Sequence, residues 1–482
     1  MTFNSFAFLA LHAFVVVAYF ALPQRRRWPL LLVASYYFYM YWRVEYAAIM
    51  LVSTTIDYVA GLLMARWPGE ALRRRRRWCL VVSLSANLAI LFFFKYYAFA
   101  VGAAGTTLGL LGFHWQAPAF DLILPVGISF YTFQSMSYTI DVYRGDCRVE
   151  RHFGIFTLYE SFYPQLVAGP IERSHHLLPQ FRQEHRFHWE AAREGMRRIL
   201  WGLFKKVVIA DHMAAIVTPA YARPLEHGGL PLWVATYAFA VQIYADFSAY
   251  SDIAIGTARM LGFDLMENFR RPYFARSIGE FWHRWHISLS TWFRDYVYIP
   301  LGGSRVSGGR WLFNVMTVFL LSGLWHGANW TFVVWGGLHG FWLVAGETTQ
   351  GWRDRLAAWV RLPRAARAWL ARLVCFHLAC FGWVFFRAES LESARSILAH
   401  LLDGWNLAAL GRMLPTGNDG LAVALALVLL LAADLADEQG EPLWRRAAAW
   451  PVGVRWFAYA TVSMLLVNFA ALDEVPFIYF QF

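Results

Sequence analysis

Three stretches of the chain place titratable side chains among apolar and aromatic residues. They are LWHGANW around His326, RWHISLS around His286, and YADFSAYSD, which holds Asp246 and Asp252. An ionisable group in a membrane costs about 2.5–3.5 kcal/mol on insertion scales, so it usually lines a cavity or carries a function. Acid–base chemistry is therefore expected in these three stretches.

His326 is the first candidate for a general base. It is flanked by Trp325 and Gly327, with Asn329 close by as a second polar group. Glycine lets the backbone approach closely, and burial disfavours the charged form of histidine. We expect a neutral imidazole that can accept a proton. A hydrogen-bonded core histidine without a chemical role fits the sequence equally well.

The segment 281–305 combines aromatic and charged residues at unusual density. His283 and His286 lie among three tryptophans, with Arg284, Arg294 and Asp295 in the same segment. An aromatic belt at a membrane interface explains the tryptophans alone. The additional His, Arg and Asp side chains favour a role beyond packing.

Asp246 and Tyr250 are four residues apart, so they share one face of a helix. Asp252 lies on roughly the opposite face, and Ser248 and Ser251 are nearby. These groups either support a catalytic site or form a structural network that joins helices.

The composition indicates a membrane protein. Apolar residues make up 58% and charged residues 16% of the 482 residues, with 24 Trp, 23 Tyr and 40 Phe. Soluble proteins are nearer 45–50% apolar and about 25% charged. A disordered chain is excluded. The four cysteines show no CxxC spacing, and the basic segment with four histidines lacks tight ligand spacing, so we expect no metal site; these histidines are His175, His176, His185 and His188.

Apolar runs alternate with basic segments along the first part of the chain. The runs 3–22, 28–42, 44–65, 78–101 and 122–140 predict five spans with the N-terminus outside. A broken segment at 153–169 and later runs bring the prediction to about ten to twelve helices in an all-α polytopic membrane protein, one domain over 1–482. Cytoplasmic segments are expected at 66–77, 144–151, 170–198 and 349–367.

Long motifs resemble the membrane-bound O-acyltransferase family, and within it the bacterial alginate O-acetyltransferase branch. The resemblance covers nearly the whole chain, and its central motifs lie within about 120–345. Its residues are FWHRWHISLSTWFRDYVYIPLGGSR and LWHGANWTFVVWGGLHG, supported by LPVGISFYTFQ, IDVYRG, FYPQLVAGPIER, YADFSAYSDIAIG, NFRRPY and PFIYFQF. His283 departs from the branch, which usually has Arg there.

The resemblance implies a fold that encloses a tunnel, with re-entrant or interfacial helices beside the spanning ones. The family's catalytic histidine maps onto His326, and its second polar position maps onto His286, which would position the donor or bond the carbonyl oxygen. Substrate contacts are expected from Trp325, Asn329, Arg284, Arg294 and Asp295, with support from Asp246, Asp252 and Tyr250.

The resemblance also implies substrates and partners. A cytoplasmic acetyl thioester, most simply acetyl-CoA, would be the donor, with no bound cofactor. Its phosphates would meet the arginines of 259–310. Separate periplasmic or membrane-tethered acetyltransferases would receive the acetyl group in the bacterial inner membrane, without nucleic acid as a partner. Alginate is the default polymer.

Other functions remain open at this point. Cellulose or another exopolysaccharide could be acetylated instead, and a D-alanyl transferase for teichoic acid would use a carrier-protein thioester. A transporter of polar solutes would explain the spans and the acids within them. It would predict internal repeats, and we find no long repeat that relates the two halves of the sequence.

Overall fold

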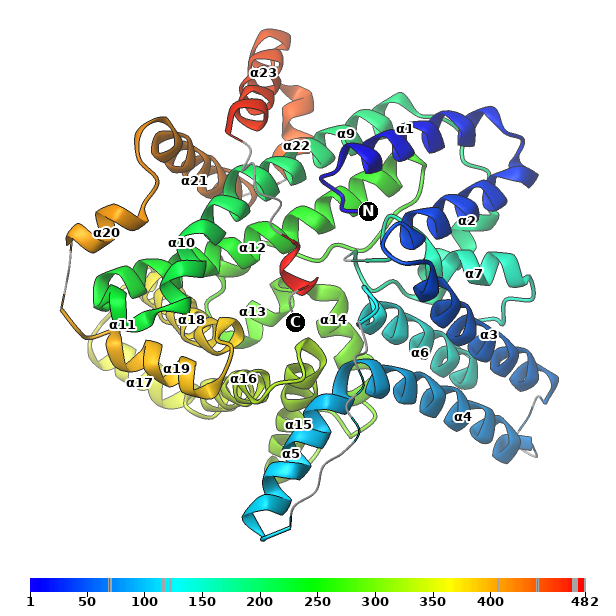
Figure 1. Ribbon diagram of the computed structural model, residues 1–482, viewed down its shortest axis with the longest axis horizontal. Helices are drawn as coiled ribbons and strands as arrows, with labels where there is room; N and C mark the ends of the chain where they lie inside the picture. Colours follow the sequence, from blue (N-terminus) through cyan, green and yellow to red (C-terminus); the bar gives the residue numbers. More distant parts are fainter. Residues whose placement is uncertain are drawn as a thin grey trace. The chain divides into compact units, whose positions relative to one another are not determined.

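The computed structural model is helical throughout the residues that it describes (Figure 1). These are 1–67, 69, 72–113, 118, 120, 124–167, 169–404, 407–438, 440, 442–469 and 476–480, without the side chains of Trp444 and Phe480. Every regular element within them is a helix, and none is a strand. The expected all-α class is confirmed.

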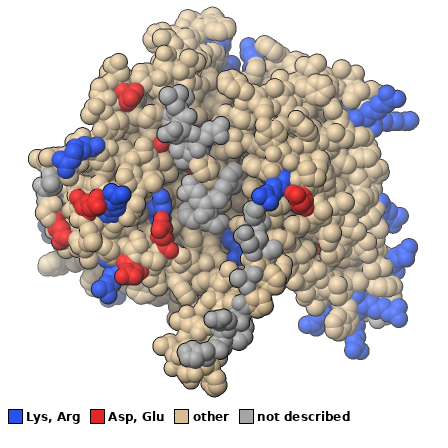
Figure 2. Space-filling view, in the orientation of Figure 1, with Lys and Arg blue, Asp and Glu red and all other residues tan. Residues whose placement is uncertain are grey.

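Within the described residues, five helical stretches are long and apolar enough to cross a membrane. They are α3 (Val44–Arg66), the continuous run Arg73–Leu110, α18 (Arg364–Arg387), α21 (Gly417–Glu438) and α23 (Val452–Phe469). On the face drawn in Figure 2, charged side chains are sparse in an otherwise uncharged surface. Many large apolar side chains are exposed, among them Phe6, Phe457 and Val467. Such exposure suits lipid, because a soluble protein rarely exposes large apolar patches. The span count of ten to twelve stays a prediction.

The chain divides into two compact units, each described by itself. Unit 1 comprises Met1–Met196 and Ala254–Met266. Besides α3, its helices are α1 (Phe6–Ala21), α2 (Gln24–Met40), α4 (Arg73–Leu91), η2 (Phe92–Tyr96), α5 (Tyr97–Leu110), α6 (Ile128–Arg144), α7 (Phe153–Ser161), α8 (Ser174–Leu177), η3 (Leu178–Arg182) and the start of α9 (Trp189–Leu203). The broken segment expected at 153–169 is the short helix α7, followed by a buried turn.

Asp57 joins three helices of unit 1. It lies on α3 and is fully buried. Its carboxylate accepts hydrogen bonds from Ser83 and Asn87 of α4 and, at 3.0 Å, from Thr139 of α6. Buried polar groups are costly unless they are hydrogen-bonded, so this set of donors fixes how the three helices pack.

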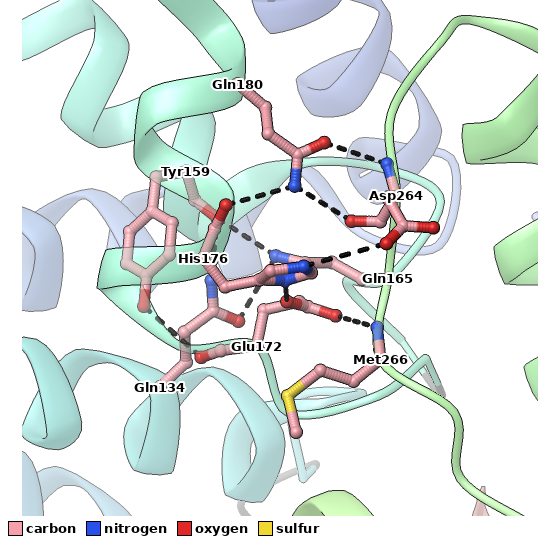
Figure 3. A network of polar contacts seen from close by, with 8 residues as sticks. All are labelled: Gln134, Tyr159, Gln165, Glu172, His176, Gln180, Asp264 and Met266. Atoms are coloured by element: carbon pink, nitrogen blue, oxygen red, sulfur yellow. Dashed lines mark hydrogen bonds and ion pairs between the residues drawn. The ribbon is translucent and has the colours of Figure 1, made fainter.

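A second polar network lies at the loops of unit 1 (Figure 3). Glu172 accepts from the Met266 backbone N–H at 2.6 Å and lies 2.7 Å from His176 Nδ1. Gln180 exchanges two hydrogen bonds with the Asp264 backbone. Asp264 and Glu172 raise the pKa of His176 to about 10. His176 is therefore a charged, half-buried link between these loops.

Unit 2 comprises Arg197–Ile253 and Glu267–Phe482. Besides α18, α21, α23 and the end of α9, its helices are η4 (Phe204–Ala210), α10 (Asp211–Ala222), α11 (Pro224–His227), α12 (Gly229–Met260, as far as Ile253), η5 (Pro272–Phe274), α13 (Ile278–Arg284), α14 (Ile287–Phe293), η6 (Arg294–Tyr298), α15 (Gly308–His326), α16 (Trp330–Thr348), α17 (Gln350–Trp359), α19 (Leu391–His400), α20 (Leu407–Met413), α22 (Leu443–Arg446), η7 (Ala447–Ala449) and η8 (Ile478–Phe480).

The apolar stretch at 311–345 forms a pair of closely packed helices, α15 and α16. A Cβ atom on Gly323 would lie 2.2 Å from the Phe332 carbonyl oxygen, and one on Gly336 would lie 2.2 Å from the Phe319 carbonyl oxygen. Only glycine permits this approach of two backbones. The glycines thus act as the sequence predicted, and the break between the helices leaves His326 as the last residue of α15.

Candidate active site

His326 lies in a box of aromatic rings in unit 2. The side chain is 2% exposed. Its ring centroid lies 4.9 Å from those of Trp325 and Trp335, 5.3 Å from Phe386 and 5.6 Å from Tyr479. Such walls exclude water and strengthen electrostatic interactions inside them.

His286 lies in the same aromatic surroundings. It precedes α14 with φ of +43°, a left-handed conformation that is uncommon for a residue with a side chain. Holding such a residue costs on the order of 1–3 kcal/mol, and such strain clusters at functional sites. Its ring lies 4.6 Å from Phe247, 5.8 Å from Trp325 and 6.4 Å from Tyr479.

Trp325 and Tyr479 therefore contact both histidines. We call the four residues His286, Trp325, His326 and Tyr479 the histidine pocket. The structure thus brings together three residues that the sequence singled out from two separate motifs. Tyr479 was missed: its motif, PFIYFQF, entered only as evidence of resemblance, since nothing local connects a C-terminal tyrosine with a histidine far earlier in the chain.

Asp246 anchors the C-terminal segment that carries Tyr479. Its Oδ2 accepts the Ile478 backbone N–H at 2.8 Å, and its Oδ1 lies 3.1 Å from Lys206 Nζ. On the same face of α12, the Tyr250 ring packs 4.1 Å from that of Phe477. The predicted shared face is confirmed, and it holds residues 476–480 against the histidine pocket.

Asp252 faces a separate, charged environment. It lies 2.6 Å from Lys205 Nζ and 2.8 Å from Arg198 Nε, and Arg198 also bonds both carboxylate oxygens of Glu267. Lys205 and its neighbour Lys206 lie among apolar residues at the end of α9 and in η4. Both are buried, and the π-helical turn η4 directs these neighbours to different aspartates.

A cavity of about 410 Å³ opens beside this charge cluster. Its lining is polar and includes five cationic side chains. One wall is Asn268, which also contacts His286, so a single residue borders both the cavity and the histidine pocket. The lining includes Arg198, Lys205, Ser248, Ser251, Asp252, Asn268, Arg270, Arg271 and Arg445.

Of the residues expected to touch substrate, the structure places Trp325 in the histidine pocket. Arg294 bonds Asp295 at 2.8 Å with its side chain 55% exposed. Arg284 pairs with Glu280 and Glu438. Asn329 caps α16 by accepting from the Thr331 N–H, and it donates to the Glu389 carbonyl. Substrate contact by these other residues stays a prediction.

Comparison with known proteins places this site in a family. The model of the membrane-bound O-acyltransferase family matches residues 152–381, which include both histidines of the pocket. The chain is 38% identical to the probable alginate O-acetylase AlgI of Pseudomonas putida, over 99% of each protein. It belongs to the membrane-bound O-acyltransferase family. It is thus a multi-pass membrane protein and an O-acyltransferase, as the motifs predicted.

Other members of the family are also similar to the chain. The peptidoglycan O-acetyltransferase of Helicobacter pylori is 34% identical over 82% of this chain and 79% of its own length. The teichoic acid D-alanyltransferase of Bacillus subtilis is 26% identical over 56% of this chain and 71% of its own. The similarity is thus higher to the two O-acetylating enzymes than to the D-alanyltransferase.

Proposed function

We propose that the protein is an inner-membrane O-acetyltransferase that passes acetyl from a cytoplasmic thioester towards an exopolysaccharide, with alginate as the first candidate. The observation that carries this proposal is the histidine pocket, two buried imidazoles sharing Trp325 and Tyr479. The full-length similarity to a probable alginate O-acetylase supports the polymer.

The pocket suits direct acyl transfer. His326 takes the proton of an acceptor hydroxyl while the oxygen attacks the thioester carbonyl. A C–O bond forms, the C–S bond breaks, and the proton passes from the imidazole to the departing thiol. The aromatic walls limit hydrolysis of the thioester by keeping water away. No metal or bound cofactor takes part in these steps.

The donor would enter through the cavity beside Asp252. Arg270, Arg271 and Arg445 line it, and guanidinium groups bind phosphates through paired, charge-assisted hydrogen bonds. Asn268 connects this wall with His286. Among the arginines of 259–310, Arg270 and Arg271 are better candidates for phosphate contact than Arg294, because these two line the cavity and Arg294 does not.

The donor assignment can be tested with purified protein in lipid discs. Labelled acetyl-CoA and a soluble hydroxyl acceptor should give labelled ester, and Arg270→Ala should raise the KM for acetyl-CoA with little change in kcat. Arg193→Ala is the matched control and should leave the KM near the wild-type value, because Arg193 pairs with Glu190 and does not line the cavity. If a carrier-protein thioester supports transfer and acetyl-CoA does not, the proposal fails and a D-alanyltransferase-like donor takes its place.

Separate periplasmic or membrane-tethered acetyltransferases would complete the pathway as partners. The polymer is decided by deleting the gene and measuring ester-linked acetyl on each envelope polysaccharide. Loss from alginate alone would support the proposal. Loss from cellulose or peptidoglycan with alginate unaffected would reassign the substrate while leaving the transfer chemistry in place.

A further inference from the structure

Asn268 makes an unusually complete set of contacts beside His286. The residue is fully buried. Its backbone carbonyl accepts the Ile287 N–H at 3.0 Å, and the neighbouring Arg270 N–H donates to the Arg284 carbonyl at 2.9 Å. These two bonds pin the backbone on either side of His286, whose positive φ needs support from its surroundings.

The side chain of Asn268 has one possible orientation. Its Oδ1 lies 3.2 Å from the Ser288 backbone nitrogen and 2.7 Å from Ser288 Oγ. A backbone N–H can only donate, so the atom that it meets must be the amide oxygen and not the amide nitrogen. The amide nitrogen then faces Ser251 Oγ, 3.2 Å away, as a donor.

This orientation determines the tautomer of His286. The imidazole Nδ1 lies 3.3 Å from the same Asn268 Oδ1. That oxygen is an acceptor, so Nδ1 carries the hydrogen. In the neutral ring the lone pair then resides on Nε2. The hydrogen bond at one ring nitrogen thereby sets the chemistry available at the other.

We propose that Asn268 is a positioning residue that holds His286 with Nε2 as its proton-accepting nitrogen. The catalytic meaning of this tautomer rests on the proposed acyl transfer. Nε2 then accepts from a hydroxyl or thiol of a substrate. It cannot donate to the thioester carbonyl, as the resemblance implied, while the ring is neutral. His286 thus supports proton removal alongside His326.

Within the described part of the chain, the residues that pack on His286 include few titratable groups. Phe247 of α12 and Trp325 of α15 do not titrate in this range, and Tyr479 of the C-terminal segment carries a phenol. From its own loop, Asn268 and Ser288 face it as neutral groups. A change of charge at position 268 should therefore act on His286 directly.

The tautomer can be read by nitrogen NMR on protein labelled with ¹⁵N-histidine in lipid discs, with His286→Gln to assign the signal. The wild type should show His286 neutral with hydrogen on Nδ1. Asn268→Ala should redistribute the hydrogen between the two nitrogens. A His286 signal with hydrogen on Nε2 in the wild type would overturn the proposal, whether or not the protein transfers acetyl.

Kinetics provide the second readout. Asn268→Ala should lower kcat about 10–100-fold with a nearly unchanged KM for the donor, the range seen for partners that orient a histidine ligand. Asn268→Asp keeps the acceptor oxygen, so it should recover most of the rate. Its negative charge favours the imidazolium and should move the acidic limb of the pH–rate profile to higher pH. An Asp variant as slow as the Ala variant with an unshifted profile would contradict the assignment.

Asn314 offers a matched control for folding. It is equally buried, and its described contacts are the Gly303 carbonyl and Arg310. Asn314→Ala should lower the amount of folded protein without altering the His286 tautomer or the pH–rate profile. The same tautomer change in both variants would show a general loss of packing, and the proposal would be rejected.

Discussion

Buried carboxylates in the two units have different partners. Asp57 of unit 1 is held by the neutral donors Ser83, Asn87 and Thr139. Asp246 of unit 2 faces Lys206 and a backbone N–H from the C-terminal segment. The sequence shows only an acid within apolar residues in both cases. Their partners distinguish the two carboxylates. Asp57 holds neighbouring helices together through neutral donors, whereas Asp246 holds the C-terminal segment against the histidine pocket and faces a lysine.

The largest effect should follow from removing the pocket histidines. His326→Ala should reduce acetyl transfer at least about 10²–10⁴-fold, the contribution of a positioned general base. His286→Ala should also impair it, by a smaller factor. The measurement is polysaccharide acetyl content relative to the amount of protein in the membrane. Near-wild-type acetylation by a well-expressed His326→Ala variant would remove the histidine from the mechanism.

Asp246→Ala should be the next most damaging change. It frees the Ile478 N–H and leaves Lys206 with Asp211, at 2.7 Å, as its remaining described acidic partner. We expect transfer to fall about 10-fold or more as residues 476–480 lose their anchor. Breaking a buried ion pair costs about 3–5 kcal/mol of stability, and this loss occurs in any variant without the carboxylate. Asp246→Asn is therefore the control, because it also removes the charge but keeps an acceptor oxygen for the Ile478 N–H. Equal activity of the Ala variant and the wild type would show that the anchor has no role in transfer.

Asp57 should affect stability and leave the chemistry intact. Asp57→Ala removes the carboxylate that accepts from Ser83, Asn87 and Thr139. Each buried donor left unsatisfied lowers the stability of the fold by about 1–3 kcal/mol. The thermal unfolding midpoint in detergent should fall, while transfer per folded molecule stays near that of the wild type. A loss of transfer at an unchanged unfolding midpoint would show that Asp57 also supports the site, and the distinction between the two carboxylates would be wrong.

The smallest effect concerns the pH dependence of stability at His176. Its pKa in the folded protein is raised to about 10, above the ordinary value of 6.5. The charged histidine therefore stabilises the fold fully below about pH 6.5, and this contribution disappears as the pH rises through 10. Unfolding midpoints of wild type and His176→Gln should differ most near pH 6 and converge towards pH 10.5. A difference that grows with pH would contradict the charged link.

The sequence predicted well those features that depend on local pattern. Glycine near His326 predicted a close approach of the backbone, which Gly323 and Gly336 provide between α15 and α16. The spacing of Asp246 and Tyr250 predicted their shared helix face. These predictions succeed because helical periodicity and glycine sterics act over a few residues.

The sequence could not predict the contacts that only tertiary packing creates. Asn268 meets His286 through a loop, and Tyr479 reaches the pocket from the far end of the chain. Lys205 and Lys206 are neighbours in the sequence, and the π-helical turn at 204–210 directs them to different aspartates. A π-turn depends on its packing environment, and no local motif in this stretch indicates it.

We propose that His326, in its aromatic pocket, is the base for acyl transfer. The most direct test compares His326→Ala with a matched histidine variant in lipid discs supplied with labelled acetyl-CoA and a soluble acceptor. The control is His12→Ala, because His12 is also buried but bonds Tyr163 in unit 1. We expect the His326 variant to bind donor and to form no ester above background, while the His12 variant retains ester formation per folded molecule. Ester formation by the His326 variant at the wild-type rate would contradict it.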